Sequence, residues 1–170
     1  MHDSKEILVE ILKKAMIKEN RSLLFYQKLA ENASTQNLKN FFQSIAKEEE
    51  HHFNILNRKL LELKMKGIFL FDDPADENIE DYRKKVWKKE LAKELQASSF
   101  EAAAISAAMS IEKEGSDFYR TEAQKVENEE AKKLLLWLSD WELEHFKFFK
   151  ELDDILTEEI WYDNNFWPVI

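Results

Sequence analysis

The sequence has 170 residues, a formal net charge of -9, no cysteine, two glycines and two prolines. The acidic charge argues against nucleic acid and anionic membrane as main partners, because both repel an acidic surface. The absence of cysteine excludes disulfides, thiol catalysis and cysteine-ligated iron sites. With so few helix breakers, the chain is expected to be helical.

The first two predicted helices form a hairpin. The first covers about 4–33, with Asp3 opening a capping box. The second covers about 36–66, with Thr35 as its N-cap and Gly67 as its C-terminal stop. Because the join between the two helices is very short, they must run antiparallel.

The next two long helices form a second hairpin of the same kind. The third helix covers about 100–126, and Ser98 begins its capping box. The fourth covers about 129–156, with Asn128 as its N-cap. Their join is equally short, so these helices are also expected to be antiparallel.

The connector between the hairpins is long enough to cross the full length of the bundle, and its stretch 76–95 also reads as helical. The aromatic tail is expected to pack on the body or at a subunit contact. No apolar run reaches ~18 residues and no signal region opens the chain, so we expect a cytoplasmic protein. The predicted architecture is one all-α domain over 1–170: hairpin 4–66, partly helical crossover 67–98, hairpin 99–157 and tail 158–170.

An internal repeat relates the two hairpins. Shifting the sequence by 93 residues superposes them without a gap, and the two caps Thr35 and Asn128 also align. This duplication predicts a pseudo-twofold axis, so a site on the axis would be built from both halves. The matched residues are Ala15, Met16, Glu19, Phe25, Tyr26, Ala30, Glu49, His52 and Phe53 with Ala108, Met109, Glu112, Phe118, Tyr119, Ala123, Glu142, His145 and Phe146.

Acidic and imidazole side chains interrupt the apolar stripe of each helix near its middle. The stripes follow alternating spacings of four and three, so they must face the bundle core. A Glu-x-x-His motif on a glutamate-rich helix usually marks a solvated face. Here two copies lie in register on core stripes, and a core glutamate precedes each about thirty residues earlier. The six residues are Glu19, Glu49, His52, Glu112, Glu142 and His145.

Four carboxylates at one level of a core would cost several kcal/mol each in lost hydration and mutual repulsion. Two divalent metal ions remove that cost, because four glutamates balance four positive charges. Oxygen-rich ligation with one imidazole per metal suits iron or manganese, whereas zinc prefers fewer ligands and tetrahedral geometry. We therefore expect two ions of iron or manganese.

The sequence resembles the ferritin-like superfamily, and within it the rubrerythrin-like proteins. The resemblance covers both hairpins and implies a four-helix di-iron carboxylate bundle. It departs from rubrerythrins proper in having no rubredoxin domain, in a longer crossover, and in Gly115, where they carry a further carboxylate. The residues that carry the resemblance are Glu19 with Phe25 and Tyr26, the run 46–52, the run 112–115 with Phe118 and Tyr119, and the run 142–145.

The resemblance also implies a role for each candidate residue. Single-carboxylate ligands would be Glu19 and Glu112, and bridging carboxylates would be Glu49 and Glu142. One nitrogen ligand per metal would come from His52 and His145. The resemblance implies a supporting role beside the ligands for Tyr26 and Tyr119, and buried aromatics with satisfied hydroxyls are the other interpretation.

Several neighbouring residues have competing interpretations. His51 could pair with Glu48, but the face they share is mostly polar, so His51 is expected to be exposed to solvent. Gly115 and its repeat partner, Ser22, either leave room for a diatomic ligand or only ease helix packing. The tryptophans that flank the fourth-helix motif, at 137 and 141, are interpreted as packing residues.

The resemblance implies a peroxidase or ferroxidase that reacts with peroxide or dioxygen, using electrons from an external donor protein. The alternatives are iron binding or storage without turnover, a di-iron oxygenase acting on an organic substrate, and a purely structural metal. Cage assembly would favour storage. We expect a homodimer.

Overall fold

The computed structural model describes the backbone of residues 2–71, 88–96 and 99–163, and side-chain burial for 4–71, 88–95 and 103–158. These parts contain five helices and no strand, which confirms the all-α prediction. None of these helices combines the length and the apolar character needed to cross a membrane. The helices are α1 (His2–Asn32), α2 (Gln36–Lys66), α3 (Lys88–Gln96), α4 (Ser99–Ala123) and α5 (Glu129–Asp163).

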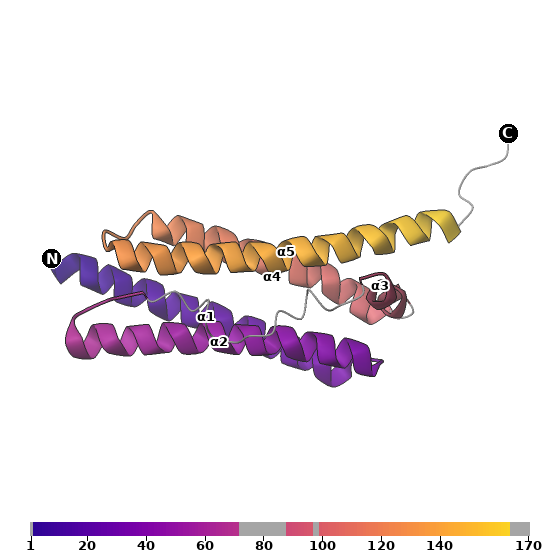
Figure 1. Ribbon diagram of the computed structural model, residues 1–170, viewed down its shortest axis with the longest axis horizontal. Coiled ribbons are helices and arrows are strands. Elements are labelled where there is room, and N and C mark those ends of the chain that lie inside the picture. The colour runs from indigo at the N-terminus through magenta and orange to yellow at the C-terminus, as the bar shows by residue number, and fades with distance from the viewer. Residues whose placement is uncertain (1, 72–87, 97–98, 164–170) are drawn as a thin grey trace.

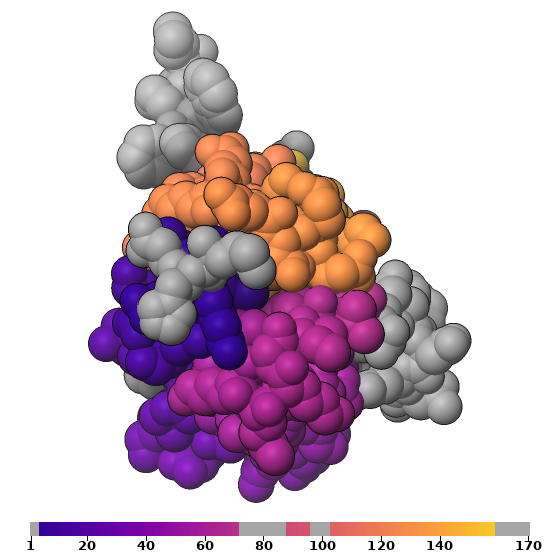
Figure 2. Space-filling view, turned by 90° about the vertical axis from the view of Figure 1, so that its left-hand side faces the viewer, coloured from indigo at the N-terminus to yellow at the C-terminus, as the bar shows by residue number. Residues whose placement is uncertain are grey.

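Two antiparallel hairpins form the bundle. Helix α1 packs along α2, and α4 packs along α5. Figure 1 shows the hairpins lying one over the other with their turns at opposite ends, as expected for a pseudo-twofold axis perpendicular to the bundle. Figure 2 views one end of the bundle, where the start of α1, the end of α2 and the first turns of α5 lie together.

The caps of α2 and α5 follow the predicted chemistry. Thr35 Oγ1 accepts a hydrogen bond from the Leu38 backbone N–H at 3.2 Å, and Asn128 Oδ1 accepts one from the Ala131 N–H at 2.8 Å. Gly67 ends α2 with φ 69°, a left-handed conformation that favours glycine because it has no Cβ. Each cap satisfies a backbone group that the helix itself leaves unpaired.

Three predicted helix ends differ from the structure. Helix α1 begins at His2, so Asp3 lies inside its first turn and is not the cap, although an acidic residue is favourable there. Helix α4 ends at Ala123, because the next two residues bond back three positions instead of four. Helix α5 continues to Asp163, since nothing in the predicted tail before Pro168 breaks a helix. The Ser98 cap lies outside the described residues.

The crossover connects opposite ends of the bundle. At one end, the backbone N–H of Phe71 donates to Glu130 Oε2 at 3.3 Å, beside the start of α5. At the other end, Glu94 of α3 accepts from Asn37 Nδ2 at 2.7 Å and from the Thr35 hydroxyl, beside the first turn of α2. The predicted crossover helix is present over Lys88–Gln96, and its part at 76–87 lies outside the described residues.

The predicted stripes of all four long helices are buried, and they divide the core into three layers along the bundle. One apolar cluster includes Phe41, Phe42 and Phe149. The other includes Leu12, Leu56 and Leu135. The layer between them holds the six acidic and imidazole side chains, all 3% exposed or less. Large apolar clusters on both sides therefore keep water from the polar layer.

Candidate metal centre

Four helices supply the six side chains of the polar layer. Helix α1 supplies Glu19 and α4 supplies Glu112, while α2 and α5 each supply a glutamate and a histidine separated by three positions. That spacing places both members of each pair on one helix face. The sequence predicted that these residues share one level of the core, and the structure brings them together there.

The ligand atoms form two groups that share two carboxylates. In each group, one atom from every residue lies within 4.8 Å of the others. Two residues belong to both groups, and they are the two for which the family resemblance implies a bridging role. The first group is Glu19, Glu49, His52 and Glu142, and the second is Glu49, Glu112, Glu142 and His145.

Both histidines turn the same ring nitrogen toward the carboxylates. His52 Nδ1 lies 3.2 Å from Glu19 Oε2 and 3.6 Å from Glu142 Oε1. His145 Nδ1 lies 3.3 Å from Glu49 Oε1 and 3.3 Å from Glu112 Oε2. Each imidazole thus presents Nδ1 to the centre and directs Nε2 outward.

Several polar atoms at the centre are buried without a hydrogen-bond partner. They include both carboxylate oxygens of Glu49, Oε2 of Glu112, Oε1 of Glu142 and Nδ1 of His145. Leaving such atoms unsatisfied costs about 1–3 kcal/mol each, and more when they are charged. Oxygen and imidazole donors in this arrangement fit two hard or intermediate divalent ions, so these buried groups could hold metal.

The cluster strongly perturbs its own ionisation. Burial raises the pKa of Glu49 and of Glu142 well above the usual range, and the surrounding glutamate charges add to the effect. Burial also acts against the charged form of Glu112, but the charge of His145 and hydrogen bonds from its neighbours overcome it and lower the pKa of Glu112 to about 2. Burial lowers the pKa of His145, yet nearby carboxylates, Glu112 foremost, raise it well above its usual value.

Two tyrosines cross-link the hairpins at the cluster. The Tyr26 hydroxyl of α1 donates to Glu112 Oε1 of α4, and the Tyr119 hydroxyl of α4 donates to Glu19 Oε1 of α1. Both side chains are fully buried. Burial and the adjacent carboxylates raise the pKa of each hydroxyl well above 10, so both remain protonated donors. Each tyrosine thereby orients a glutamate of the opposite hairpin.

Replacing Tyr26 with phenylalanine is expected to destabilise the metal-free protein by about 1–3 kcal/mol, because Glu112 Oε1 loses its hydroxyl donor in a buried site. Urea unfolding measures the loss. Tyr119→Phe removes the equivalent bond to Glu19 and should give a similar value. Unchanged stability in both variants would show that the hydroxyls do not support the glutamates.

Gly115 provides space for a ligand side chain. A Cβ at this position would lie 3.1 Å from Glu142 Oε2 and 3.3 Å from its Cδ, a distance at which the neighbour has to shift. The room beside Gly115 is therefore filled by Glu142 itself. Of the two interpretations made from sequence, close packing is the one that this geometry supports.

Glu48 is buried, contrary to its assignment to a polar face with His51. It is 1% exposed. Its Oε2 accepts from His145 Nε2 at 2.9 Å and from the Trp141 indole N–H at 3.1 Å. The helical neighbours of Glu48 suggested a solvated face, but they did not reveal that α5 covers this side of α2. The 93-residue repeat could have indicated that Glu48 is not on a solvated face. It aligns Glu48 with Trp141, and each of these residues directly precedes a predicted bridging glutamate.

His51 also differs from its predicted surroundings, whereas the two tryptophans do not. His51 is half-buried and not solvent-exposed, and its ring centroid lies 6.5 Å from that of His52. Trp137 and Trp141 approach the His52 ring edge-on, with centroids 5.6 and 5.5 Å away. These ring contacts agree with the packing interpretation, and the two tryptophans form the outer wall of the His52 position.

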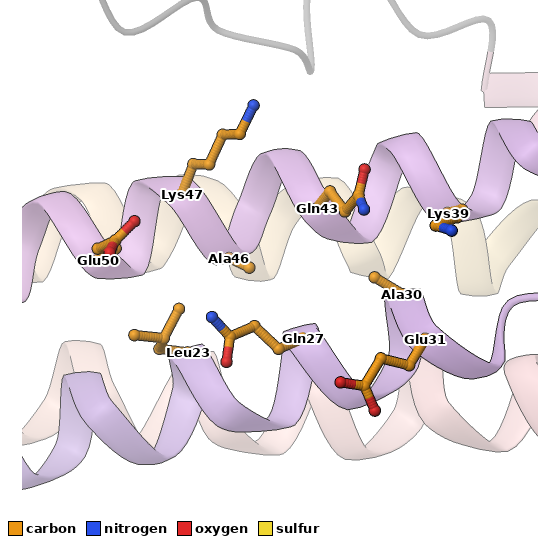
Figure 3. A pocket seen from close by; sticks show the side chains of 9 residues that line it. All are labelled: Leu23, Gln27, Ala30, Glu31, Lys39, Gln43, Ala46, Lys47 and Glu50. Atoms are coloured by element: carbon orange, nitrogen blue, oxygen red, sulfur yellow. The ribbon is translucent and has the colours of Figure 1, made fainter.

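Two described grooves lie apart from the cluster. One groove, of about 850 Å³, lies between α1 and α2. Figure 3 shows its lining, with Leu23 and Gln27 on α1 and Ala46 and Glu50 on α2. A smaller groove of about 400 Å³ lies beside α4 and α5. None of the six cluster residues lines either groove, so neither groove places an organic substrate against the polar layer.

The fold and the cluster define a class of protein: a four-helix bundle whose core carries carboxylates and histidines in the arrangement of di-metal carboxylate sites. The Rubrerythrin family model matches residues 10–153, and the chain belongs to this family. Membership suggests a di-iron carboxylate protein.

The match spans both hairpins and gives no sign of a rubredoxin domain. No curated protein sequence matches the chain. A solved structure described as a hypothetical protein from Pyrococcus furiosus is similar over 89% of this chain and 90% of that one, with a TM-score of 0.61 and 24% identity. That likeness supports the fold alone.

Proposed function

We propose that the six buried residues bind two iron ions and that the protein reduces peroxide or dioxygen with electrons from an external donor protein. The observation that carries the proposal is the sharing of Glu49 and Glu142 between two ligand groups. Each group also has one carboxylate and one imidazole of its own. Sharing of this kind suits a pair of adjacent metal ions better than two separate sites.

The protein residues would have distinct tasks in this reaction. The four carboxylates balance the charge of two divalent ions, and the histidines supply one neutral nitrogen to each. The tyrosines fix Glu19 and Glu112 through their hydroxyls, which limits how these carboxylates reorient. The apolar clusters on either side exclude bulk water from the site.

Two ferrous ions, when bound, supply the two electrons that convert hydrogen peroxide and two protons into two molecules of water. Returning the site to the ferrous state then needs two electrons. The 170 residues contain no cysteine to ligate a second centre, so a separate donor protein is part of the proposal. Peroxide and dioxygen are small, which is consistent with a site that neither described groove reaches.

Anaerobic loading with ferrous iron, followed by mixing with peroxide or with oxygenated buffer, tests the proposal. Stopped-flow absorbance should show oxidation of two iron ions per chain, faster than oxidation of the same iron free in solution. A His52→Ala variant should lose this acceleration, whereas Glu50→Gln, an exposed change on the same helix, should keep it. Oxidation no faster than that of free iron would contradict the proposal.

A homodimer is also part of the proposal, and light scattering measures it. A large hollow assembly that retains many iron ions per chain would favour storage instead.

A further inference from the structure

The outer nitrogens of the two cluster histidines have different surroundings. His145 Nε2 lies 2.9 Å from Glu48 Oε2, and both side chains are buried. In that geometry the imidazole donates its Nε2–H to the carboxylate, which fixes the ring with Nδ1 turned toward Glu49 and Glu112. The His145 ring is therefore already oriented for a metal ion.

His52 lacks this support. Its Nε2 is buried without a hydrogen-bond partner, and its Nδ1 lies 3.2 Å from Glu19 Oε2. The repeat places Trp141 where Glu48 stands in the other half, because the two residues are separated by the repeat offset of 93. An indole N–H only donates, and that of Trp141 is directed to Glu48. The position that supports His145 with an acceptor thus offers none to His52.

This difference affects metal binding directly. A neutral imidazole that binds metal through Nδ1 must carry its proton on Nε2. At His145 the Nε2–H donates to the Glu48 carboxylate, an arrangement that raises ligand basicity and holds the ring in place. At His52 the same proton would be buried against the tryptophan rings without an acceptor, which is unfavourable.

We infer that the two metal positions are unequal: the ion held by Glu112 and His145 binds first and tightly, and the ion held by Glu19 and His52 binds second and exchanges more readily. Glu48 is the positioning residue that creates the difference, acting through His145. The inference rests on the proposed two-metal site and adds an order of filling to it. The two halves, although related by an internal repeat, therefore have different roles.

Calorimetric titration of the metal-free full-length protein with Co²⁺ tests the order of filling. Co²⁺ is stable in air and also reports its ligand geometry through its visible absorption bands. The expected result is two binding steps, with the first at least ~10-fold tighter, since a supporting carboxylate contributes roughly 10–100-fold in metal affinity. His145→Ala should remove the tight step, and His52→Ala should remove the weak one.

Variants of Glu48 and Trp141 test whether the Glu48 hydrogen bond causes the difference in affinity between the two metal positions. Glu48→Leu should weaken the tight step by ~10–100-fold and bring the two steps together. Glu48→Gln keeps an acceptor oxygen without the charge, so a smaller loss is expected. Trp141→Gln should strengthen the weak step by giving His52 Nε2 an acceptor, whereas Trp141→Phe should not. Glu50→Gln serves as the exposed control, and circular dichroism verifies that each variant is folded.

The outcomes separate this inference from the proposed function. Two ions binding with equal affinity, or Glu48→Leu and Glu48→Gln weakening both steps equally, would overturn the inequality while leaving a two-metal site. Failure of the wild-type protein to bind two ions would overturn the proposed function, and the inference with it. A tight step that survives in His145→Ala would reverse the assigned order and also overturn the inference.

Discussion

Replacing Glu49 with glutamine is expected to weaken binding of both metal ions and, at the same time, to stabilise the metal-free protein. Glu49 belongs to both ligand groups and is fully buried, with no hydrogen-bond partner on either carboxylate oxygen. A neutral amide is a poor ligand at a bridging position. Because changes in residues that only support ligands already cost ~10–100-fold in affinity, a larger loss is expected here for both binding steps.

The opposite effect on the metal-free protein has an electrostatic origin. Burial and the Glu112 charge raise the pKa of Glu49, so ionising this carboxyl in the folded protein is unfavourable. At a pH above the raised pKa of Glu49, the folded metal-free protein carries the cost of an ionised buried carboxylate, ~1.4 kcal/mol for each unit of the pKa shift. The glutamine amide has no charge and removes this cost.

Calorimetry with Co²⁺ and urea unfolding in the presence of a chelator measure the two effects of Glu49→Gln. The neighbouring change Glu50→Gln is the matched control, because Glu50 is exposed on the same helix. It should alter neither metal affinity nor stability by much, since surface substitutions of this kind usually stay within about 0.5 kcal/mol. Unchanged metal binding in Glu49→Gln would contradict the bridging role.

The metal-free protein is expected to become less stable as the pH rises from about 5 to 8. The folded-state pKa values of Glu49 and Glu142 are raised, so the folded state keeps protons that the unfolded carboxyls release above about 4.5. Stability therefore falls by up to ~1.4 kcal/mol per pH unit for each extra proton bound. His145 acts in the same direction: its contribution is present below its unfolded pKa and is lost as the pH rises through its raised folded value.

The contribution of Glu112 to stability changes with pH in the opposite direction and over a lower pH range. With its pKa lowered to about 2, it contributes stability above its unfolded pKa that is lost as the pH falls toward 2. The metal-free protein should therefore be most stable near pH 5. Thermal or urea unfolding across this range, with a chelator present, measures the profile. A rise in stability from pH 5 to pH 8 would contradict the buried-carboxylate explanation.

Bound metal should reverse the pH dependence of stability, so that the metal-loaded protein becomes more stable as the pH rises. The ions favour deprotonated ligands, so their stabilisation grows with pH, as the ligand protons become easier to displace. At a free concentration one hundred times the dissociation constant, each site contributes ~2.7 kcal/mol. Unfolding with two equivalents of Co²⁺ at pH 5 and at pH 8 checks the prediction. An exposed acidic cluster without a specific site would give a small effect that added salt removes.

The fold could be predicted in most of its parts because the chain is locally consistent. The apolar spacing of each long helix, the Thr35 and Asn128 caps and the Gly67 stop all indicate the same boundaries, and short joins force antiparallel hairpins. The boundaries that failed, at Asp3, after Ala123 and beyond Leu156, depend on local choices among good helix formers. Helix ends of that kind carry a weak sequence signal.

The six-residue cluster could also be located from sequence, since an internal repeat on core stripes leaves one place where two Glu-x-x-His motifs and two further glutamates meet. Their function as metal ligands stays a prediction. What the sequence could not reveal is which residues stand behind the ligands. Glu48 lies on the same helix as Glu49 and appeared to belong to a solvated face.

The sequence by itself determined a two-hairpin helical bundle, its pseudo-twofold repeat and the level at which the acidic and imidazole side chains meet. These follow from periodicity and chain connectivity, which are local properties. Only the tertiary structure decided that Glu48 is buried against α5, that Gly115 makes room for Glu142, and that the Trp141 indole donates to Glu48. Those facts depend on how one helix rotates against another, and a small rotation changes which side chains meet without changing any sequence pattern.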